Sequence, residues 1–294
     1  MKMRKILTLL TAALLMASCA PRTNTGQAVT DTFRDDYNRT VVVPTHPKRV
    51  VSTSPAVTEI IFALGADSLL VGRTDFCNYP AEAKKIESIG GISNLSIEKI
   101  LSLSPDLVIS GSMIPQKSAD QLAAMGVPMV CVIEKQQFDG LFANILAIGS
   151  LIGSSEAAEQ LVANLKARVP QVPDLDDSLP TVYYVVGFGS TGNYTAGGNT
   201  FINDIIEMAG GRNVAKDVKG WSYSVEALMD SDPDYIMIRR EDSATFVRLA
   251  PYKRLSAVRE GRLIPVESST VDLQVPRNIE AVETLRQALH PNKN

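Results

Sequence analysis

The stretch Arg49-Val50-Val51-Ser52-Thr53-Ser54-Pro55-Ala56 joins a short apolar run to the beginning of a helix. The apolar run predicts a strand at residues 50–52. The Ser54-Pro55 pair then supplies an N-cap and a proline at the first helical position, where its missing N–H costs nothing. A helix is predicted over residues 56–64, and Gly65 stops it.

The same succession of strand and helix continues along the chain, which is the signature of α/β architecture with largely parallel sheets. Three prolines, Pro170, Pro173 and Pro180, separate two such series. The expected strands cover residues 50–52, 69–72, 107–109, 129–133, 182–186, 235–238 and 263–266, and the expected helices cover residues 56–64, 116–125, 141–151, 157–169, 200–209 and 279–289.

This organisation predicts two Rossmann-like α/β lobes, over residues 33–138 and 181–294. A helical connection over residues 139–180 carries the chain from one lobe to the other. A single stiff helix between lobes permits only small relative motion, whereas several strand crossovers allow wide hinge closure.

An internal repeat supports two related lobes. The segment Ser96-Ile97-Glu98-Lys99-Ile100-Leu101 leads to Pro105-Asp106, and Ser224-Val225-Glu226-Ala227-Leu228-Met229 leads to Pro233-Asp234. Ser, Glu, Pro and Asp occupy the same four offsets, 128 residues apart, and each copy runs into an apolar strand. A capped helix before a strand is the simpler explanation, but it does not require four matched identities.

The first residues predict export. A basic segment with Lys2, Arg4 and Lys5 precedes an apolar run that is too short to span a bilayer and has the length of a signal peptide. Met16-Ala17-Ser18-Cys19 resembles a bacterial lipobox, which implies removal of residues 1–18 and acylation of Cys19. Residues 19–32 are polar and predict a tether between the anchor and the globule.

The remaining composition limits the partners. The formal net charge of −3 argues against nucleic acid, which needs concentrated Lys and Arg. Cys77 and Cys131 permit a disulfide in an oxidising compartment, but two cysteines in so long a chain do not require one.

Three kinds of chemistry lack the necessary residues. The G-x-G-x-x-G at residues 187–192 is followed by more loop, whereas a dinucleotide site needs a helix to begin there. A bare-metal site needs several histidines, and His46 and His290 are the only two, near opposite ends of the globule. Serine hydrolysis lacks a G-x-S-x-G elbow, so the sequence predicts no enzyme and no cofactor.

The chain resembles the periplasmic-binding family for iron–siderophores, haem and vitamin B12, whose members serve ABC importers. This resemblance implies a class III solute-binding protein, with two lobes joined by a single long backbone helix. It covers nearly everything from Arg49 onward and rests on Arg49 to Ala56 with Thr58-Glu59, on Asn78-Tyr79-Pro80, on both repeat segments, on Tyr194-Thr195-Ala196-Gly197-Gly198 and on Gly210-Gly211-Arg212-Asn213-Val214.

In that family each lobe presents one glutamate to the importer's membrane subunits, and Glu98 and Glu226 occupy the matching places. Two exposed carboxylates, one on each lobe, would fix the orientation of docking. The alternative is that both merely complement a helix N-terminus, which is worth about 0.3–1 kcal/mol each.

The ligand is expected between the lobes, where loops at the carboxyl ends of parallel strands converge. Phe76-Cys77-Asn78-Tyr79-Pro80 resembles the cobalamin-binding branch, and Gly90-Gly91-Ile92 departs from it where that branch can carry another aromatic. Aromatic faces would hold a flat macrocycle, and Arg239 would face an anionic chelate unless it is simply solvated. The candidate ligand-binding residues are Phe76, Tyr79, Tyr194, Trp221, Tyr223 and Arg239.

These observations predict a monomeric, exported, lipid-anchored substrate-binding protein that delivers a metal chelate to the permease of an ABC importer. A cobalt corrinoid is the first choice of ligand, and an iron–siderophore or haem is the alternative. A periplasmic sensor or adaptor on the same scaffold remains open, because fold does not fix function.

Overall fold

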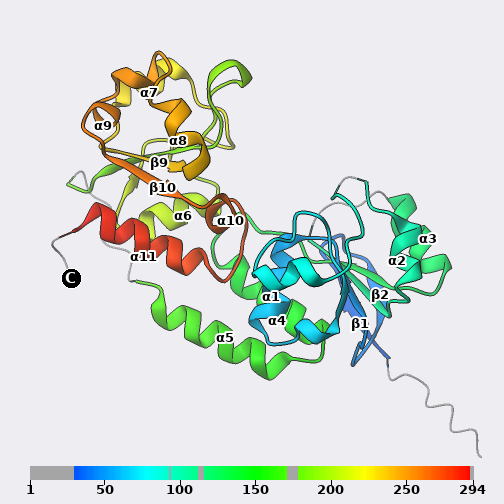
Figure 1. The fold of residues 1–294 in the computed structure, drawn as a ribbon. Helices are drawn as coiled ribbons and strands as arrows, with labels where there is room; N and C mark the ends of the chain where they lie inside the picture. The colour runs from blue at the N-terminus through cyan, green and yellow to red at the C-terminus, as the bar shows by residue number, and fades with distance from the viewer. Residues whose placement is uncertain (1–29, 93, 112–115, 171–177, 292–294) are drawn as a thin grey trace, which may run out of the picture.

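The computed structural model describes residues 30–92, 94–111, 116–170 and 178–291, which form two α/β lobes side by side (Figure 1). Each lobe contains a four-stranded parallel sheet, with strand order β4-β3-β5-β6 in the N-terminal lobe and β10-β9-β7-β8 in the C-terminal lobe. The strands of the N-terminal lobe are β3 Val50–Ser52, β4 Leu70–Gly72, β5 Leu107–Ser110 and β6 Met129–Cys131; those of the C-terminal lobe are β7 Thr181–Val185, β8 Arg212–Asn213, β9 Tyr235–Arg239 and β10 Leu263–Val266.

Helices cover both faces of the sheets. They are α1 Pro55–Ala63, α2 Ile97–Ser102, α3 Gln116–Ala124, α4 Gly140–Leu151, α5 Ser155–Arg168, α6 Phe201–Met208, α7 Val225–Ser231, α8 Arg240–Phe246, α9 Ser256–Arg259, α10 Ser268–Val271 and α11 Asn278–Leu289. Every strand and helix expected from the apolar patterns is present, with ends that differ by at most two residues.

The first strand and helix form as their sequence predicts, with one difference. Ser54 occupies the N-cap position of α1 with an extended backbone and Pro55 follows it, but the Ser54 side chain makes no capping hydrogen bond. Gly65, with φ of +66°, ends the helix in the left-handed region that glycine adopts without strain.

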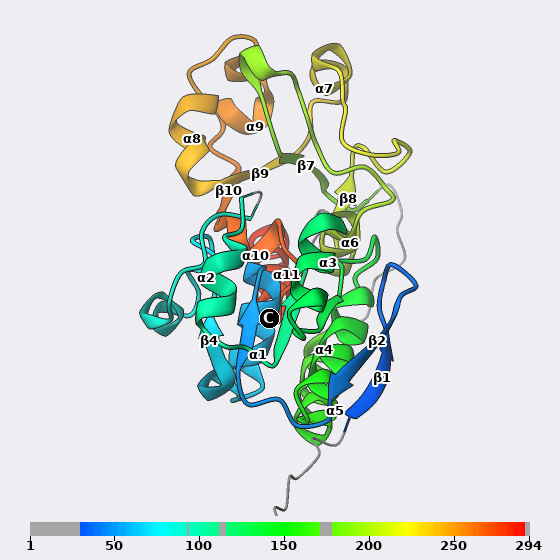
Figure 2. The ribbon, with the colours of Figure 1, turned by 90° about the vertical axis from the view of Figure 1, so that its right-hand side faces the viewer.

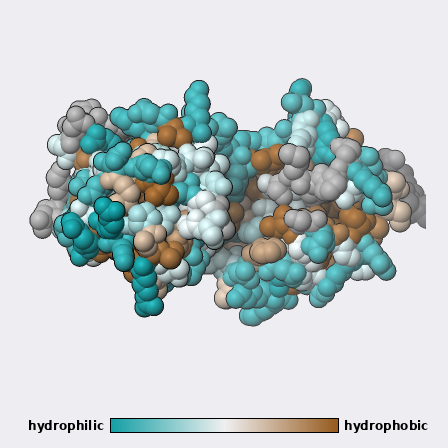
Figure 3. Space-filling model, turned by 90° about the horizontal axis from the view of Figure 1, so that it is seen from above, coloured by the Kyte–Doolittle hydropathy of each residue, from teal (hydrophilic) through white to brown (hydrophobic). Residues whose placement is uncertain are grey.

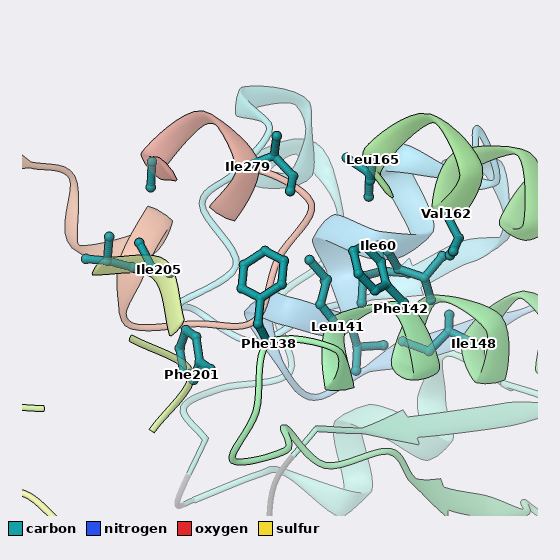
Figure 4. Packing of buried hydrophobic residues seen from close by; sticks show 14 of the residues in the cluster. Ile60, Phe138, Leu141, Phe142, Ile148, Val162, Leu165, Phe201, Ile205 and Ile279 are labelled. Carbon is teal, nitrogen blue, oxygen red and sulfur yellow. The ribbon is translucent and has the colours of Figure 1, made fainter. Parts of the chain in front are cut away.

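One hydrophobic core spans both lobes. Successive strand residues alternate between faces, so Val50 enters this shared core while Val51 enters a smaller cluster under α2 and α3. In the C-terminal lobe Tyr184 joins the shared core and Tyr183 joins the outer cluster. Figure 4 shows how Phe138 bridges the lobes, between residues of α4, α6 and α11.

The helical connection contains the two helices that the sequence predicted, α4 and α5. Helix α4 belongs to the shared core, and α5 runs beneath it toward the C-terminal lobe (Figure 1). The two helices pack closely, because a Cβ on Gly149 would lie 2.4 Å from that of Ala158. The lobes also contact each other directly: the Asp204 carboxylate of α6 accepts a hydrogen bond from the Phe138 amide at 2.8 Å.

The internal repeat is visible as matched local structure. Ser96 and Ser224 each cap a helix by accepting a hydrogen bond from the backbone N–H three residues on. Asp106 accepts hydrogen bonds from the amides that lead into β3, and Asp234 does the same for β7. Ser104 and Asp232, at the same offset, both adopt positive φ.

An antiparallel hairpin was not expected. It consists of β1 Thr30–Arg34 and β2 Thr40–Pro44 and lies at the side of the N-terminal lobe (Figure 2). Asp35, in the turn between β1 and β2, forms an ion pair with Arg39 at 2.6 Å. It also accepts a hydrogen bond from the Cys131 amide at the edge of the sheet. Strand β1 therefore takes up residues 30–32 of the predicted tether.

The predicted signal peptide and Cys19 lie outside the described residues. Between residues 30 and 291, with positions 93, 112–115 and 171–177 left aside, no helix has both the length and the apolar character needed to cross a membrane.

Candidate ligand-binding cleft

A cavity of about 670 Å³ lies between the lobes. Seen from above, the surface is hollowed where the two lobes meet (Figure 3). The N-terminal lobe contributes the start of α1 and the loops after β4, and the C-terminal lobe contributes α10 and the segment leading to α11. Its lining residues are Pro55, Glu59, Phe76, Asn78, Tyr79, Ile92, Glu267, Ser268, Ser269, Asp272, Leu273 and Arg277.

An ion pair joins the lobes at this cavity. Arg277, at the N-cap of α11, donates two hydrogen bonds of 2.8 Å to the carboxylate of Glu59 on α1. The guanidinium also lies 3.6 Å from the ring centroid of Tyr79, within range of a cation–π interaction. Burial raises the pKa of Glu59, and the Arg277 guanidinium opposes that rise.

A second charged group occupies the C-terminal wall. Asp272 accepts hydrogen bonds from the Tyr184 hydroxyl at 2.5 Å and from Arg239 at 2.9 Å. Burial raises the pKa of the Tyr184 hydroxyl, and the neighbouring Asp272 charge raises it further. The hydroxyl therefore stays protonated and donates to the carboxylate.

The loop after β4 brings aromatic side chains to the cavity. Phe76 is 58% exposed and Tyr79 is 46% exposed, and both line the cavity, as the sequence predicted for ligand contacts. Cys77 between them is fully buried, where its thiol contacts the hydroxyls of Thr58 at 3.1 Å and Thr74 at 3.3 Å. These contacts fix the loop to α1 and explain why its aromatic rings point outward.

A second pair of exposed aromatics lies on the C-terminal lobe. Tyr194 and Trp221 are 39% and 45% exposed, and the Thr195 amide donates to the Trp221 carbonyl at 2.8 Å. The glycine-rich loop packs on Tyr194, because a Cβ on Gly187 or Gly192 would come within 3.0 Å of its ring. Neither Tyr194 nor Trp221 lines the cavity between the lobes.

The two remaining candidates have internal partners. The Tyr223 ring packs against Tyr183 at 5.7 Å and joins the outer cluster of the C-terminal lobe. Arg239 is held by Asp272 and lies 3.8 Å from Asp242, so its charge is already neutralised.

Sequence reasoning missed Glu59, Asp272 and Arg277 as residues of the cavity. Glu59 carried a usable signal, because it is a carboxylate within the apolar pattern of a buried helix. The other two residues gave none, since their roles depend on contacts between distant parts of the chain.

The described residues contain no cluster of three or more His, Cys, Asp or Glu side chains able to hold a metal ion. Cys77 and Cys131 are both buried and free, so they do not form a disulfide here.

A family model described as periplasmic binding protein matches residues 50–270, which include most of both lobes. The chain belongs to the periplasmic binding protein family. The family inferred from the sequence is therefore confirmed.

Individual relatives agree with this assignment. The uncharacterized ABC transporter substrate-binding lipoprotein YvrC of Bacillus subtilis (strain 168) is 31% identical over 302 residues, which cover 97% of this chain and 96% of the relative. A cobalamin-binding protein of Halobacterium salinarum is 30% identical over 273 residues, which cover 87% of this chain and 73% of the relative.

Solved structures support the fold. The periplasmic heme-binding protein RhuT from Roseiflexus sp. RS-1, in apo form, superposes with a TM-score of 0.74 at 28% identity, covering 83% of this chain and 98% of its own. The predicted fold class, two parallel-sheet α/β lobes of a class III solute-binding protein, is confirmed.

Glu98 and Glu226 occupy equivalent positions in this periplasmic binding protein. Each is exposed in the first turn of a helix that follows a capping serine, α2 in one lobe and α7 in the other. Among the residues whose positions are described, neither carboxylate forms a salt bridge. Both are therefore available to a partner of opposite charge.

Proposed function

We propose that this chain is the substrate-binding lipoprotein of an ABC importer and captures a metal chelate, with a cobalt corrinoid as the first candidate. The observation that carries the proposal is a cavity between the lobes with exposed aromatic rings, Phe76 and Tyr79, at its surface. Aromatic faces contribute most of the binding free energy of a large ring ligand, because they bury apolar surface whether or not the ligand is charged.

The names of two relatives support an importer function and a corrinoid ligand. The Halobacterium salinarum relative is named a cobalamin-binding protein, and YvrC is named an ABC transporter substrate-binding lipoprotein. Tyr194 and Trp221 provide further exposed rings on loops that follow strands of the C-terminal lobe. We include them among the proposed ligand contacts, although neither belongs to the lining of the cavity.

Haem or an iron–siderophore is the second candidate, favoured by the similarity to the heme-binding protein RhuT. Isothermal titration of the full chain in detergent with cyanocobalamin, haem and ferric siderophores tests both candidates. The corrinoid proposal expects cyanocobalamin to bind most tightly. Tighter binding of haem or a siderophore would replace the corrinoid but keep the transport proposal, and the absence of binding to all three would reject a chelate-binding function.

We propose that Glu98 and Glu226 dock to the permease, where each would pair with a basic group of the importer. Replacing both with alanine should abolish ligand uptake while leaving ligand affinity intact, because neither residue lines the cavity. The control is Glu82→Ala with Glu241→Ala, which also removes one exposed glutamate from each lobe. Unchanged uptake in the Glu98 and Glu226 variant would favour a sensor or adaptor instead.

Lipid attachment at Cys19 would keep the monomeric globule at the outer face of a bacterial membrane. Cys19→Ser should abolish incorporation of labelled fatty acid and release the protein from the membrane fraction. Continued incorporation in that variant would assign the lipid to another residue.

A further inference from the structure

Charges on the cavity wall are unevenly distributed. Of the described lining residues, Glu59, Glu267 and Asp272 are acidic and Arg277 is basic. Arg277 is committed to Glu59 by two 2.8 Å hydrogen bonds, and its side chain is only 11% exposed. The wall therefore offers an incoming anion no unpaired cation among these residues.

The last residue of β9, Arg239, and the first residue of α8, Arg240, also form ion pairs. Arg239 donates to Asp272 at 2.9 Å, and Arg240 donates to Glu267 at 2.8 Å. In both pairs the acidic partner lines the cavity and the arginine does not. An anionic group of a ligand would meet the carboxylates before the guanidinium groups.

An anionic ligand thus faces two unfavourable choices. It can displace Asp272 or Glu59 from its arginine, which leaves that carboxylate unpaired in a partly buried site, or it can approach the carboxylates as a like charge. Neutral groups meet neither obstacle, because Asn78, Ser268 and Ser269 on the wall can exchange hydrogen bonds with amides.

We infer that the cleft selects chelates whose ring side chains are neutral amides and rejects those whose ring side chains are carboxylates. This inference rests on the proposed function, that the cleft binds a metal chelate, and it names the charge class of that ligand. Selection arises from carboxylates that already occupy the local arginines, so charge repulsion contributes to specificity.

The main comparison uses two ligands that share one ring and differ in charge. Affinities of the full chain in detergent are measured by titration for cyanocobalamin, which carries no net charge, and for its derivative with two side-chain amides hydrolysed to carboxylates. We expect the dicarboxylate to bind at least about tenfold more weakly. Haem, with two propionates, is the third ligand and should also bind more weakly than cyanocobalamin.

A variant removes one of these negative charges. Asp272→Asn keeps the shape of the side chain but frees the Arg239 guanidinium, so the affinities for the dicarboxylate and for haem, each relative to that for cyanocobalamin, should rise at least about threefold. Asp242→Asn is the matched control, since it lies 3.8 Å from the same arginine but does not line the cavity. It should leave all three affinities unchanged.

The outcomes separate this inference from the proposed function. If the dicarboxylate or haem binds wild-type protein as tightly as cyanocobalamin does, the charge selection is wrong and chelate binding stands. If no chelate binds at all, the proposed function fails and the inference falls with it. The comparison of ligands on wild-type protein decides the question even if Asp272→Asn does not fold.

Discussion

Glu59 and Arg277, 218 residues apart in the chain, form a bidentate ion pair that connects the N-terminal lobe to the segment before α11. Their side chains are 5% and 11% exposed. Because Arg277 also lies over the ring of Tyr79, one guanidinium links the contact between lobes to an aromatic residue of the candidate cleft.

Removing one partner of this pair should be costly. Arg277→Met leaves the Glu59 carboxylate buried without its partner, and we expect a loss of about 3–5 kcal/mol in the free energy of unfolding, measured by urea denaturation. Adding Glu59→Leu to the same protein should recover most of that loss, since no buried charge then remains.

The exposed pair Arg168–Glu283, which joins α5 to α11, provides the control. Both of its side chains are more than 40% exposed, so Arg168→Met should cost less than about 1 kcal/mol. Equal losses for Arg277→Met and Arg168→Met would show that burial does not govern the strength of the Glu59–Arg277 pair.

Trp221 is expected to contact the ligand. Trp221→Ala should weaken chelate binding by about 0.5–1.5 kcal/mol, plus the contribution of the lost apolar area. Titration calorimetry measures this change, and Leu249→Ala, which removes another exposed apolar side chain of the C-terminal lobe, is the control. An unchanged affinity would remove Trp221 from the binding site.

Cys77 is expected to position the loop that carries Phe76 and Tyr79. Cys77→Ala deprives the Thr74 and Thr58 hydroxyls of a buried partner, so it should cost about 1–3 kcal/mol of stability and also weaken ligand binding. Cys131→Ala removes the other buried thiol, which lies in β6 and does not line the cleft, and should reduce stability without changing affinity. A Cys77→Ala protein with wild-type affinity would contradict the positioning role.

Glu134 predicts a pH effect on stability. Burial raises its pKa above the ordinary 4.5, and the nearby Asp272 charge adds to this rise. The folded state therefore binds the proton more tightly than the unfolded state, and the stabilisation that comes with protonation is lost as the pH rises through the folded pKa.

Glu134→Gln keeps an acceptor for the Gln274 amide but carries no charge. It should raise the free energy of unfolding at pH 7, and the gain should shrink as the pH is lowered toward 4.5, where the wild-type carboxyl also becomes neutral. Urea denaturation across this range measures the gain, with Glu156→Gln at an exposed position as the baseline. A gain that grows on acidification would contradict the raised pKa.

Local patterns were sufficient where an element depends on its own residues. The run at Val50–Ser52 followed by Ser54-Pro55 predicted β3 and α1, because apolar periodicity and end signals act within a few residues. Elements without such patterns were missed: β8 has two residues, α9 and α10 have four each, and the β1–β2 hairpin is stabilised by a turn that pairs Asp35 with Arg39.

For the candidate site, the sequence predicted Phe76, Tyr79 and Arg239 as ligand contacts, and the structure places the first two, but not Arg239, on the cavity wall. In the structure Arg239 donates a hydrogen bond to Asp272, a residue 33 positions away. The ion-pair partner of a long charged side chain is set by the residues that the fold places near it. A local sequence pattern does not show which residues these are.

The amino-acid sequence alone thus determined the α/β class, the paired lobes and the serine-capped helices that carry Glu98 and Glu226, because periodicity and capping are short-range properties. Only the tertiary structure decided that one core continues through both lobes, that Glu59 meets Arg277, and that the arginines near the cleft are already paired. Those features arise from burial and charge neutralisation between residues far apart in the chain, and such interactions exist only once the lobes have packed together.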